Sequence, residues 1–449
     1  MFRKGLVRAA ACAALACVGW SGLARAADDV AATRDVNSGG ATQPALASDL
    51  SLRPLYLDDA TPAARMPLMA LLDSAGLAKG LDEAKINIGG GIAGSYTYSF
   101  SKPPGDFITG RVFDVEDESP LLNQIELFVE RTVDDAITKH QFDIGGRMEW
   151  RWGGDSRFIH ANGLFDHYGF GDGPRNQFDL TQAFVDVAIP VGNGIKLRVG
   201  KFVTTIGYEV IEPWGNDLYS HSYLFGYAIP FTQTGVQAYY TFNDSWSVNA
   251  AITRGWDQAL EDNNSAVDFL GGVTYSFGKD NDPFSAMGGK GSKLIVNLSE
   301  GPQEPGDSGN YRTLIDVQLT TTVGDNLKLG LNADYAYEPN SIATAKREDA
   351  QWFGAAFYAG YKLNDAFTVN CRAEYFNDDD GARLTGAVGG AGVFEATLGL
   401  AITPFPNDAF GKNLVVRPEV RYDYASKNFF DAGTDRYQFT AAIDAYYKF

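Results

Sequence analysis

The chain has 449 residues, of which 50 are glycine and 13% are aromatic, and its formal net charge is −19. Such acidity argues against nucleic acid as a partner, because the phosphates would repel it. Abundant glycine, tyrosine, phenylalanine, threonine and asparagine favour strands and turns over helices. Beyond the first 26 residues no run of about 18 apolar residues occurs, which excludes a membrane-spanning helix there.

Residues 1–26 predict a cleavable secretory leader. Three basic residues open it, a short apolar run follows, and Ala24-Arg25-Ala26 fits a cleavage site. An N-terminal anchor, or lipid attachment at Cys17, is the alternative. Cleavage removes four basic residues from a charge of −19, which leaves −23. It also leaves Cys371 as the sole cysteine, so that no intrachain disulfide is available.

Residues 27–82 predict a periplasmic linker that contains one short helix. The linker is rich in alanine, serine, threonine, aspartate and proline. Within it, four apolar residues recur at helical spacing and Gly76 could end the helix: Leu68, Leu71, Leu72 and Ala75. We expect this helix to lead into the first strand; a helix that plugs a pore is the alternative.

Residues 83–449 alternate between apolar and polar positions. For example, Leu327, Leu329 and Leu331 alternate with Lys328 and Gly330. Such alternation is typical of a soluble sandwich, or of a barrel whose apolar face meets lipid. Full charges on the polar face, aromatic residues at strand ends and the alternation of short turns with long loops favour the barrel. The sequence therefore predicts an all-β fold, a transmembrane antiparallel β-barrel.

We expect about 16 strands, with 14 and 18 as the alternatives. This number places both ends of the barrel on the periplasmic side. The two strands that flank residues 278–291 have the weakest pattern, and residues 158–168 are expected to form a loop. The predicted strands begin near Lys85, Leu122, Lys139, Phe178, Ile195, Gln233, Trp246, Ala266, Ser292, Tyr311, Leu327, Gln351, Phe367, Val393, Leu414 and Arg436.

The last strand carries a specific pattern. Tyr437, Phe439, Ile443 and Tyr447 lie on one face, and the chain ends on Phe449. A terminal alternating strand that ends in phenylalanine resembles the signal read by the outer-membrane assembly machinery. We therefore expect the outer membrane of a Gram-negative cell, with its lipids and lipopolysaccharide as partners.

No motif for catalysis or for a cofactor is present. The sequence lacks Gly-x-Ser-x-Gly, His-Glu-x-x-His and P-loop patterns. We predict no catalytic residue, no cofactor and no metal; a barrel lipase that uses His140 is the alternative. The acidic runs at residues 261–264 and 377–381 could bind Ca²⁺, but neither has EF-hand spacing, and solvated loop tips are the preferred interpretation.

Functional residues of a barrel channel should lie on the inner face. Opposed charges at a constriction would orient polar solutes and select ions. Alternatively, the charges pair across neighbouring strands and only hold the wall together. The run from Arg417 to Asp423 is the preferred part of a selective wall. By parity the pore-lining candidates are Arg147, Glu149, Arg151, Lys196, Arg198, Lys328, Asp334, Arg372, Glu374, Arg417, Glu419, Arg421 and Asp423.

Residues 203–232 form a long, aromatic, glycine-bearing stretch. It could fold into the pore and narrow it, cap the barrel or contact a neighbouring subunit; we favour the first. Its candidate constriction residues are Glu209, Glu212, Trp214, Asn216, Asp217 and His221.

The same stretch carries a family resemblance. It contains Gly200-Lys201-Phe202, Ile206-Gly207-Tyr208-Glu209, Tyr219-Ser220-His221-Ser222 and Ala228-Ile229-Pro230-Phe231-Thr232, and Gly255-Trp256-Asp257 follows one hairpin later. In these residues the chain resembles the OmpL-like putative beta-barrel porin family, from about residue 68 to the end. Family members often have arginine at position 221 and histidine at 233, so the charge of this loop departs from the family pattern. The resemblance implies an outer-membrane channel and supplies neither catalytic residues nor a settled substrate.

Together these patterns predict a porin with a wide, charged lumen that lets small polar solutes or ions diffuse passively. A structural or surface-binding barrel with a blocked lumen is the alternative. The acidity favours cations over anions. A homotrimer is expected only by analogy with barrels of this size.

Overall fold

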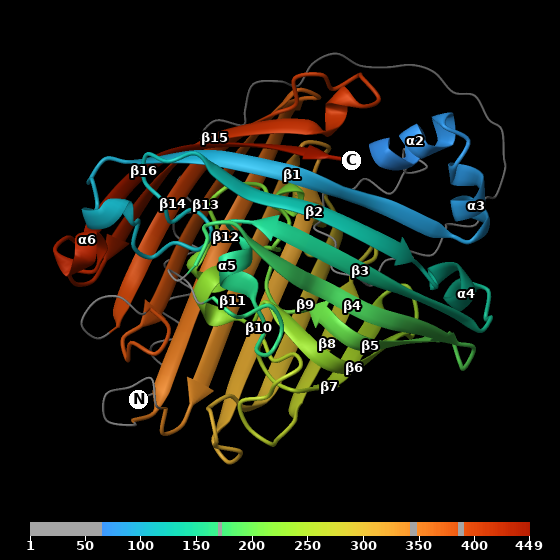
Figure 1. Cartoon of the computed structure of the whole chain (residues 1–449), viewed down its shortest axis with the longest axis horizontal. Helices are drawn as coiled ribbons and strands as arrows, with labels where there is room; N and C mark the ends of the chain where they lie inside the picture. Colours follow the sequence, from blue (N-terminus) through green and yellow to red (C-terminus); the bar gives the residue numbers. More distant parts are fainter. Residues whose placement is uncertain (1–64, 169–172, 342–347, 385–389) are drawn as a thin grey trace. The chain divides into compact units, whose positions relative to one another are not determined.

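The strands of the chain close into one antiparallel barrel. The structure, a computed structural model, describes residues 65–168, 173–341, 348–384 and 390–449. Each strand pairs with its neighbours in sequence, and β16 pairs with β1 (Figure 1). The strands are β1 Ile86–Ser99, β2 Leu121–Arg131, β3 Asp143–Gly153, β4 Gln177–Ile189, β5 Ile195–Val203, β6 Thr232–Thr241, β7 Trp246–Thr253, β8 Asp268–Ser276, β9 Gly289–Pro302, β10 Tyr311–Val323, β11 Leu327–Glu338, β12 Ala350–Asn364, β13 Phe367–Asp378, β14 Ala391–Ile402, β15 Leu414–Ala425 and β16 Tyr437–Lys448.

Closure of the barrel depends on the two ends of the sheet. The register of β1 on β16 runs from Gly91 opposite Lys448 to Ser99 opposite Thr440. The Phe449 N–H donates to the Gly90 carbonyl oxygen, and the Gly90 N–H donates back, both at 2.9 Å. The sheet therefore has no open edge, which is the condition for a sheet to lie in hydrocarbon.

The period-two pattern separates an apolar outer face from a polar inner face. On β13, Tyr375 is 44% exposed, whereas Arg372 and Glu374 are 2% and 1% exposed. Aromatic side chains near strand ends, such as Trp152 and Tyr335, are exposed on the outer face. Long charged side chains of the strands therefore point inward, where they avoid the cost of a charge on a face that meets lipid.

The predicted strands are confirmed, including the two that flank residues 278–291. Most begin within two residues of the expected position. The third begins at Asp143 and not near Lys139, because the N–H groups of residues 139–141 donate back to the short helix α4 Asp134–Thr138 and not to a neighbouring strand. β9 begins at Gly289, three residues early, where a bulge shifts its register on β10.

Short helices occupy the linker and the connections. The predicted linker helix is confirmed as α2 Pro67–Ser74, which Gly76 follows with φ +73°, and α3 Ala78–Glu83 comes next. Both helices contact β1, and Met66 lies against Gly89 on its inner face. The others are η1 Pro104–Asp106, α5 Ser156–Ile159, η2 Pro213–Gly215, η3 Leu224–Ala228, η4 Ser285–Met287, η5 Gly411–Asn413 and α6 Phe430–Gly433. Within the described ranges, no helix is both long and apolar enough to cross a membrane.

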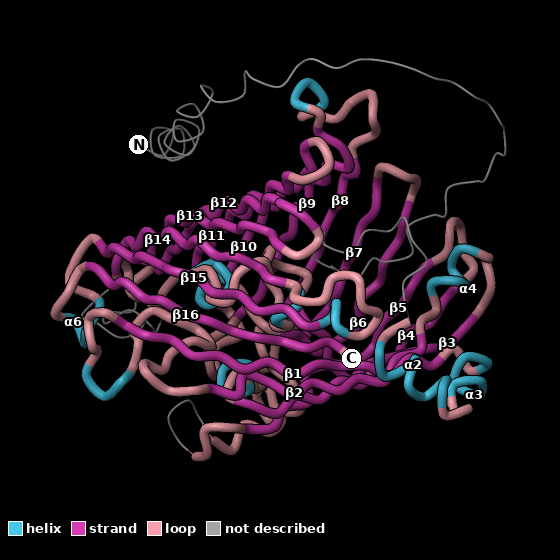
Figure 2. Tube along the Cα trace, turned by 90° about the horizontal axis from the view of Figure 1, so that it is seen from above, coloured by secondary structure: helices cyan, strands magenta, loops and turns pink. Residues whose placement is uncertain are grey.

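The two ends of the barrel differ in their connections. At one end, here called the turn end, β1 begins, β16 ends, and brief turns join β4 to β5, β6 to β7, β10 to β11 and β12 to β13. At the other, the loop end, the connections are long. Figure 2 shows loop traces inside the ring of strands. The lumen therefore contains parts of the chain itself.

Candidate functional site

The connection from β5 to β6 lies inside the barrel. Residues 204–231, here called the inserted segment, contain η2 and η3. Near its start, Asn297 of β9 donates to the Thr205 carbonyl oxygen at 3.1 Å. Further along, the Tyr219 hydroxyl lies 2.7 Å from Ser95 Oγ on β1. The inserted segment therefore reaches walls on different sides of the lumen.

Side-chain chemistry explains why the inserted segment folds inward. Tyr223, Leu224, Phe225 and Ile229 are buried in one apolar cluster with residues of other loops and of the wall. This burial removes their apolar surface from water within the lumen. The Trp352 indole N–H of β12 donates to the Ala228 carbonyl oxygen at 3.1 Å, so a polar group at this end is also satisfied.

One asparagine organises the turn of the inserted segment. The Asn216 side-chain amide donates to the carbonyl oxygens of Val210 at 2.7 Å and Glu212 at 3.0 Å, and its oxygen accepts from the Val210 N–H at 2.9 Å. A side-chain amide that closes a loop in this way replaces main-chain pairing. Asn216 therefore shapes the turn of the inserted segment and is half-buried within it.

Glu209 and His221 form the buried centre of the inserted segment. The Glu209 carboxylate lies 2.9 Å from His221 Nδ1, accepts from Arg372 at 2.8 Å and accepts from the Tyr358 hydroxyl at 3.1 Å. Burial alone would raise the pKa of Glu209, but Arg372 and His221 outweigh it and lower the pKa to about 2. Glu209 is thus held as a carboxylate.

The other constriction candidates are half-buried. Glu212 lies 3.2 Å from Arg151 of β3. The Trp214 ring lies over Gly91 of β1, and its centroid is 6.4 Å from that of Tyr446. Asp217 is bound through its main-chain carbonyl oxygen, which accepts from Asn370 at 2.8 Å.

Acidic wall candidates accept hydrogen bonds from the inserted segment. Glu374 accepts from the N–H groups of Tyr223 and Leu224, both at 2.7 Å. Glu419 accepts from the N–H groups of Tyr219 at 2.8 Å and Ser220 at 3.1 Å. These carboxylates are therefore engaged by the chain itself.

Basic wall candidates donate to the same stretch. Arg372 donates to the Ser220 carbonyl oxygen and Arg421 to that of His221, both at 2.6 Å. Arg417 donates to the carbonyl oxygens at positions 213 and 216, at 3.0 and 2.6 Å. The wall arginines and glutamates therefore alternate as donors and acceptors along the main chain of the inserted segment.

Many wall charges also pair across neighbouring strands, as the alternative interpretation expected. Arg417 pairs with Asp444 of β16 at 2.6 Å, Arg372 with Glu395 of β14 at 2.5 Å and Arg198 with Asp186 of β4 at 2.9 Å. Asp423 accepts from Arg421 of its own strand at 2.9 Å, and Lys196 lies 3.2 Å from Asp134 of α4.

The last two wall candidates lie on β11. Asp334 lies opposite another carboxylate, Asp316 of β10, and Lys328 is half-buried.

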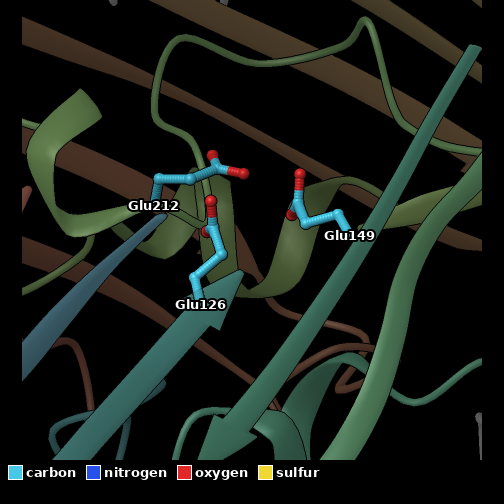
Figure 3. A group of neighbouring side chains, drawn as sticks. All are labelled: Glu126, Glu149 and Glu212. Atoms are coloured by element: carbon cyan, nitrogen blue, oxygen red, sulfur yellow. The ribbon is translucent and has the colours of Figure 1, made fainter. Parts of the chain in front are cut away.

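Three carboxylates meet where β2, β3 and the inserted segment converge. The ligand atoms of Glu126, Glu149 and Glu212 lie within 4.8 Å of one another (Figure 3). Arg151 Nη2 is 2.6, 3.0 and 3.2 Å from these three carboxylates, and Arg147 pairs with Glu149 at 2.7 Å. The Arg151 guanidinium thus occupies the position in which a cation would neutralise the carboxylates.

The connection from β1 to β2 also enters the lumen, which the sequence reasoning missed. Its Arg111 donates to Asp423 at 2.7 Å and to Thr440 at 3.0 Å. Its Phe113 packs edge-on against His221, with ring centroids 5.0 Å apart. The available signal was the apolar character of residues 112, 113 and 115 in a connection expected to face water.

These connections lie inside the lumen that the sequence predicted to be wide, and they contact strands on several sides of its wall. Beneath the inserted segment, a cavity of about 10 Å³ is bordered by Tyr208, Asp217, Tyr358 and Arg372, among others. That volume holds about one water molecule. The wall polar groups bind chain atoms at this level instead of bulk water.

Comparison with known proteins places this barrel in a family. Residues 85–449 match the family described as putative beta-barrel porin-2, OmpL-like. The chain belongs to this family. It is accordingly a porin of the outer-membrane type with a 16-stranded barrel. No curated protein matches it.

Solved structures share the fold at low sequence identity. The outer-membrane channel DcaP of Acinetobacter baumannii is 13% identical with a TM-score of 0.51, over 81% of this chain and 97% of that one. OprB of Pseudomonas putida is 13% identical with a TM-score of 0.52, over 84% and 97%. The anion-selective porin of Comamonas acidovorans is 11% identical with a TM-score of 0.50, over 81% and 99%. At such identity these likenesses establish the architecture of this porin alone.

Proposed function

We propose that the porin conducts small hydrophilic solutes and ions passively through a path that the inserted segment narrows. The observation that carries this proposal is the placement of residues 204–231 across the lumen, with half-buried Glu212, Trp214 and Asp217 at its surface. A constriction of polar groups and rings admits hydrated solutes by size and charge.

Planar-bilayer recordings test the proposal directly. The pure refolded protein should give discrete current steps. Replacing residues 210–226 by a short glycine-serine linker should raise the single-channel conductance, because the obstruction is then gone. The matched control shortens the mostly exposed residues 305–309 of the β9–β10 connection and should conduct like the wild type. Absence of current steps from the wild-type protein would defeat the proposal.

A closed structural barrel is the second candidate function. The apolar cluster inside the barrel favours it, since such a cluster resembles a protein core. It predicts current from the shortened variant and none from the wild type, so the same recordings separate the two functions.

We infer that residues 1–26 direct the export of the porin and are then cleaved off. We also infer that the turn end faces the periplasm and the loop end faces the exterior. The leader and most of the linker lie outside the described residues. Phe449 at the end of β16 would be read by the assembly machinery, and lipid and lipopolysaccharide would surround the apolar outer face. A homotrimer is supported by analogy alone; cross-linking in intact membranes tests it.

We propose no enzymatic role, cofactor or metal. His221 Nδ1 lies 2.9 Å from Glu209, and His160 Nε2 lies 2.8 Å from Gln177, so both histidines are engaged in hydrogen bonds within the protein. A lipase would require lipid hydrolysis that disappears on replacement of His140. A radiolabelled phospholipid assay of the pure protein tests this alternative.

A further inference from the structure

The inner wall binds the inserted segment through its main chain. Glu374 and Glu419 each accept from two consecutive N–H groups, at positions 223–224 and 219–220. Arg372, Arg417 and Arg421 donate to carbonyl oxygens between positions 213 and 221. These five wall residues are here called the clamp. Charge-assisted bonds to a main chain hold its position and do not depend on the side chains that it carries.

A second feature of the wall fits the side chains of the inserted segment. On four strands an inward glycine lies directly beneath a large side chain. An added Cβ would lie 2.3 Å from Trp214 at Gly91, 2.8 Å from Tyr208 at Gly330, 2.8 Å from Leu224 at Gly354 and 2.6 Å from Leu218 at Gly399. A real Cβ does not approach a neighbour this closely, so a larger residue at any of these four positions would displace the side chain above it. These four glycines are here called the seats.

We propose that the clamp and the seats form a receptor that holds the inserted segment, residues 204–231, docked against the wall. In this role the inserted segment is called the plug below. The clamp charges therefore set how far the channel is open and do not select the ions that pass. This inference rests on the proposed function. It reverses the role expected for the run from Arg417 to Asp423, which the sequence assigned to a selective wall.

Burial supports this assignment of roles. Glu374 and Arg421 are each 1% exposed, and Glu419 is 5% exposed. A passing ion is not in contact with such groups, and each is already compensated by a hydrogen bond or ion pair. Removal of a clamp charge consequently acts through the position of the plug.

The sharpest test changes no charge. Gly91→Ala and Gly399→Ala should displace Trp214 and Leu218 and raise single-channel conductance at least about two-fold, with the reversal potential in a salt gradient unchanged. Gly271→Ala is the matched control, because an added Cβ on this outward glycine of β8 would lie 2.8 Å from the ring of Phe269, which is exposed on the outer face away from the inserted segment. The control should conduct like the wild type.

The clamp is tested in parallel with Glu374→Gln and Glu419→Gln. If the clamp is a plug receptor, both variants should have a higher conductance and an unchanged reversal potential. If the clamp is a selective wall, the conductance should be unchanged and the reversal potential should shift toward anion preference; this result would overturn the inference. Heat-modifiable migration on gels establishes that each variant is folded, and protease added to proteoliposomes should cut the plug of every variant with raised conductance faster than that of the wild type.

The outcomes separate this inference from the proposed function. If the variant without residues 210–226 conducts strongly but the seat and clamp variants match the wild type, the receptor is refuted and the constriction stands. If the wild type gives no current steps, the proposed function itself fails, whether or not the shortened variant conducts.

Discussion

Single residues in this porin act through their partners more than through their own charge. Glu209 is the clearest case, because Arg372, His221 and Tyr358 surround its carboxylate within the plug. Burial opposes its charge, yet Arg372 and His221 lower its pKa from an ordinary value of 4.5 to about 2. An acid whose pKa falls on folding contributes stability above its ordinary pKa, and this contribution is lost as the pH falls through the folded value.

We therefore predict that Glu209→Gln removes a pH-dependent part of the stability. In the wild type, Glu209 should contribute on the order of 3 kcal/mol at neutral pH, lost between about pH 4.5 and pH 2. Urea unfolding of the protein in lipid vesicles, at about pH 6 and about pH 3, measures this difference. The variant should lose less stability on acidification than the wild type. Equal losses in both proteins would contradict the role of Glu209.

At the scale of elements, the last strand closes the sheet. Phe449 exchanges two main-chain hydrogen bonds with Gly90, and the outward side chains of β16 include Phe439 and Ile443. Two such bonds contribute about 1 kcal/mol each. That amount is small beside the remaining ladder between β16 and β1, so the barrel should close without Phe449.

Deletion of Phe449 should consequently lower assembly in cells more than stability. We expect a several-fold smaller folded fraction in outer-membrane preparations, measured by heat-modifiable gel migration, while refolding into pure lipid stays close to wild type. Phe439→Leu, at an exposed outward position of β16, is the control and should assemble normally. A normal folded fraction without Phe449 would show that the terminal residue is not the assembly signal.

At the scale of the whole molecule, charge should bias the ions that pass. The chain carries a formal net charge of −19, which becomes −23 on the proposed cleavage of residues 1–26, and acidic groups such as Glu212 reach the lumen from the plug. Fixed negative charge attracts cations over about one Debye length, which is ~10 Å at 0.1 M salt and ~3 Å at 1 M.

Reversal potentials across a salt gradient should accordingly show a weak cation preference. The preference should decline when both solutions are raised to about 1 M salt, because screening shortens the reach of the fixed charges. An anion preference at low salt would contradict the expectation drawn from net charge. It would indicate that lumenal arginines are the dominant source of the electrostatic field in the channel.

The sequence by itself determined the barrel. Alternation with period two fixes which side chains face lipid. In β11, which begins at Leu327 and Lys328, this alternation is as clear in the sequence as in the structure. The strand number followed from the spacing of turns, and Gly76 marked the end of the linker helix. These features are local, so a single chain suffices to read them.

Only the tertiary structure decided what the inner charges do. Parity placed Arg417, Glu419 and Arg421 inward, but whether they meet water or chain depends on where residues 204–231 lie. Residues about 200 positions apart become partners there, and no local pattern encodes such a contact. For the same reason the sequence did not predict the role of Arg111 or of the four glycine seats. Each of these roles depends on a contact with a residue far away in the sequence.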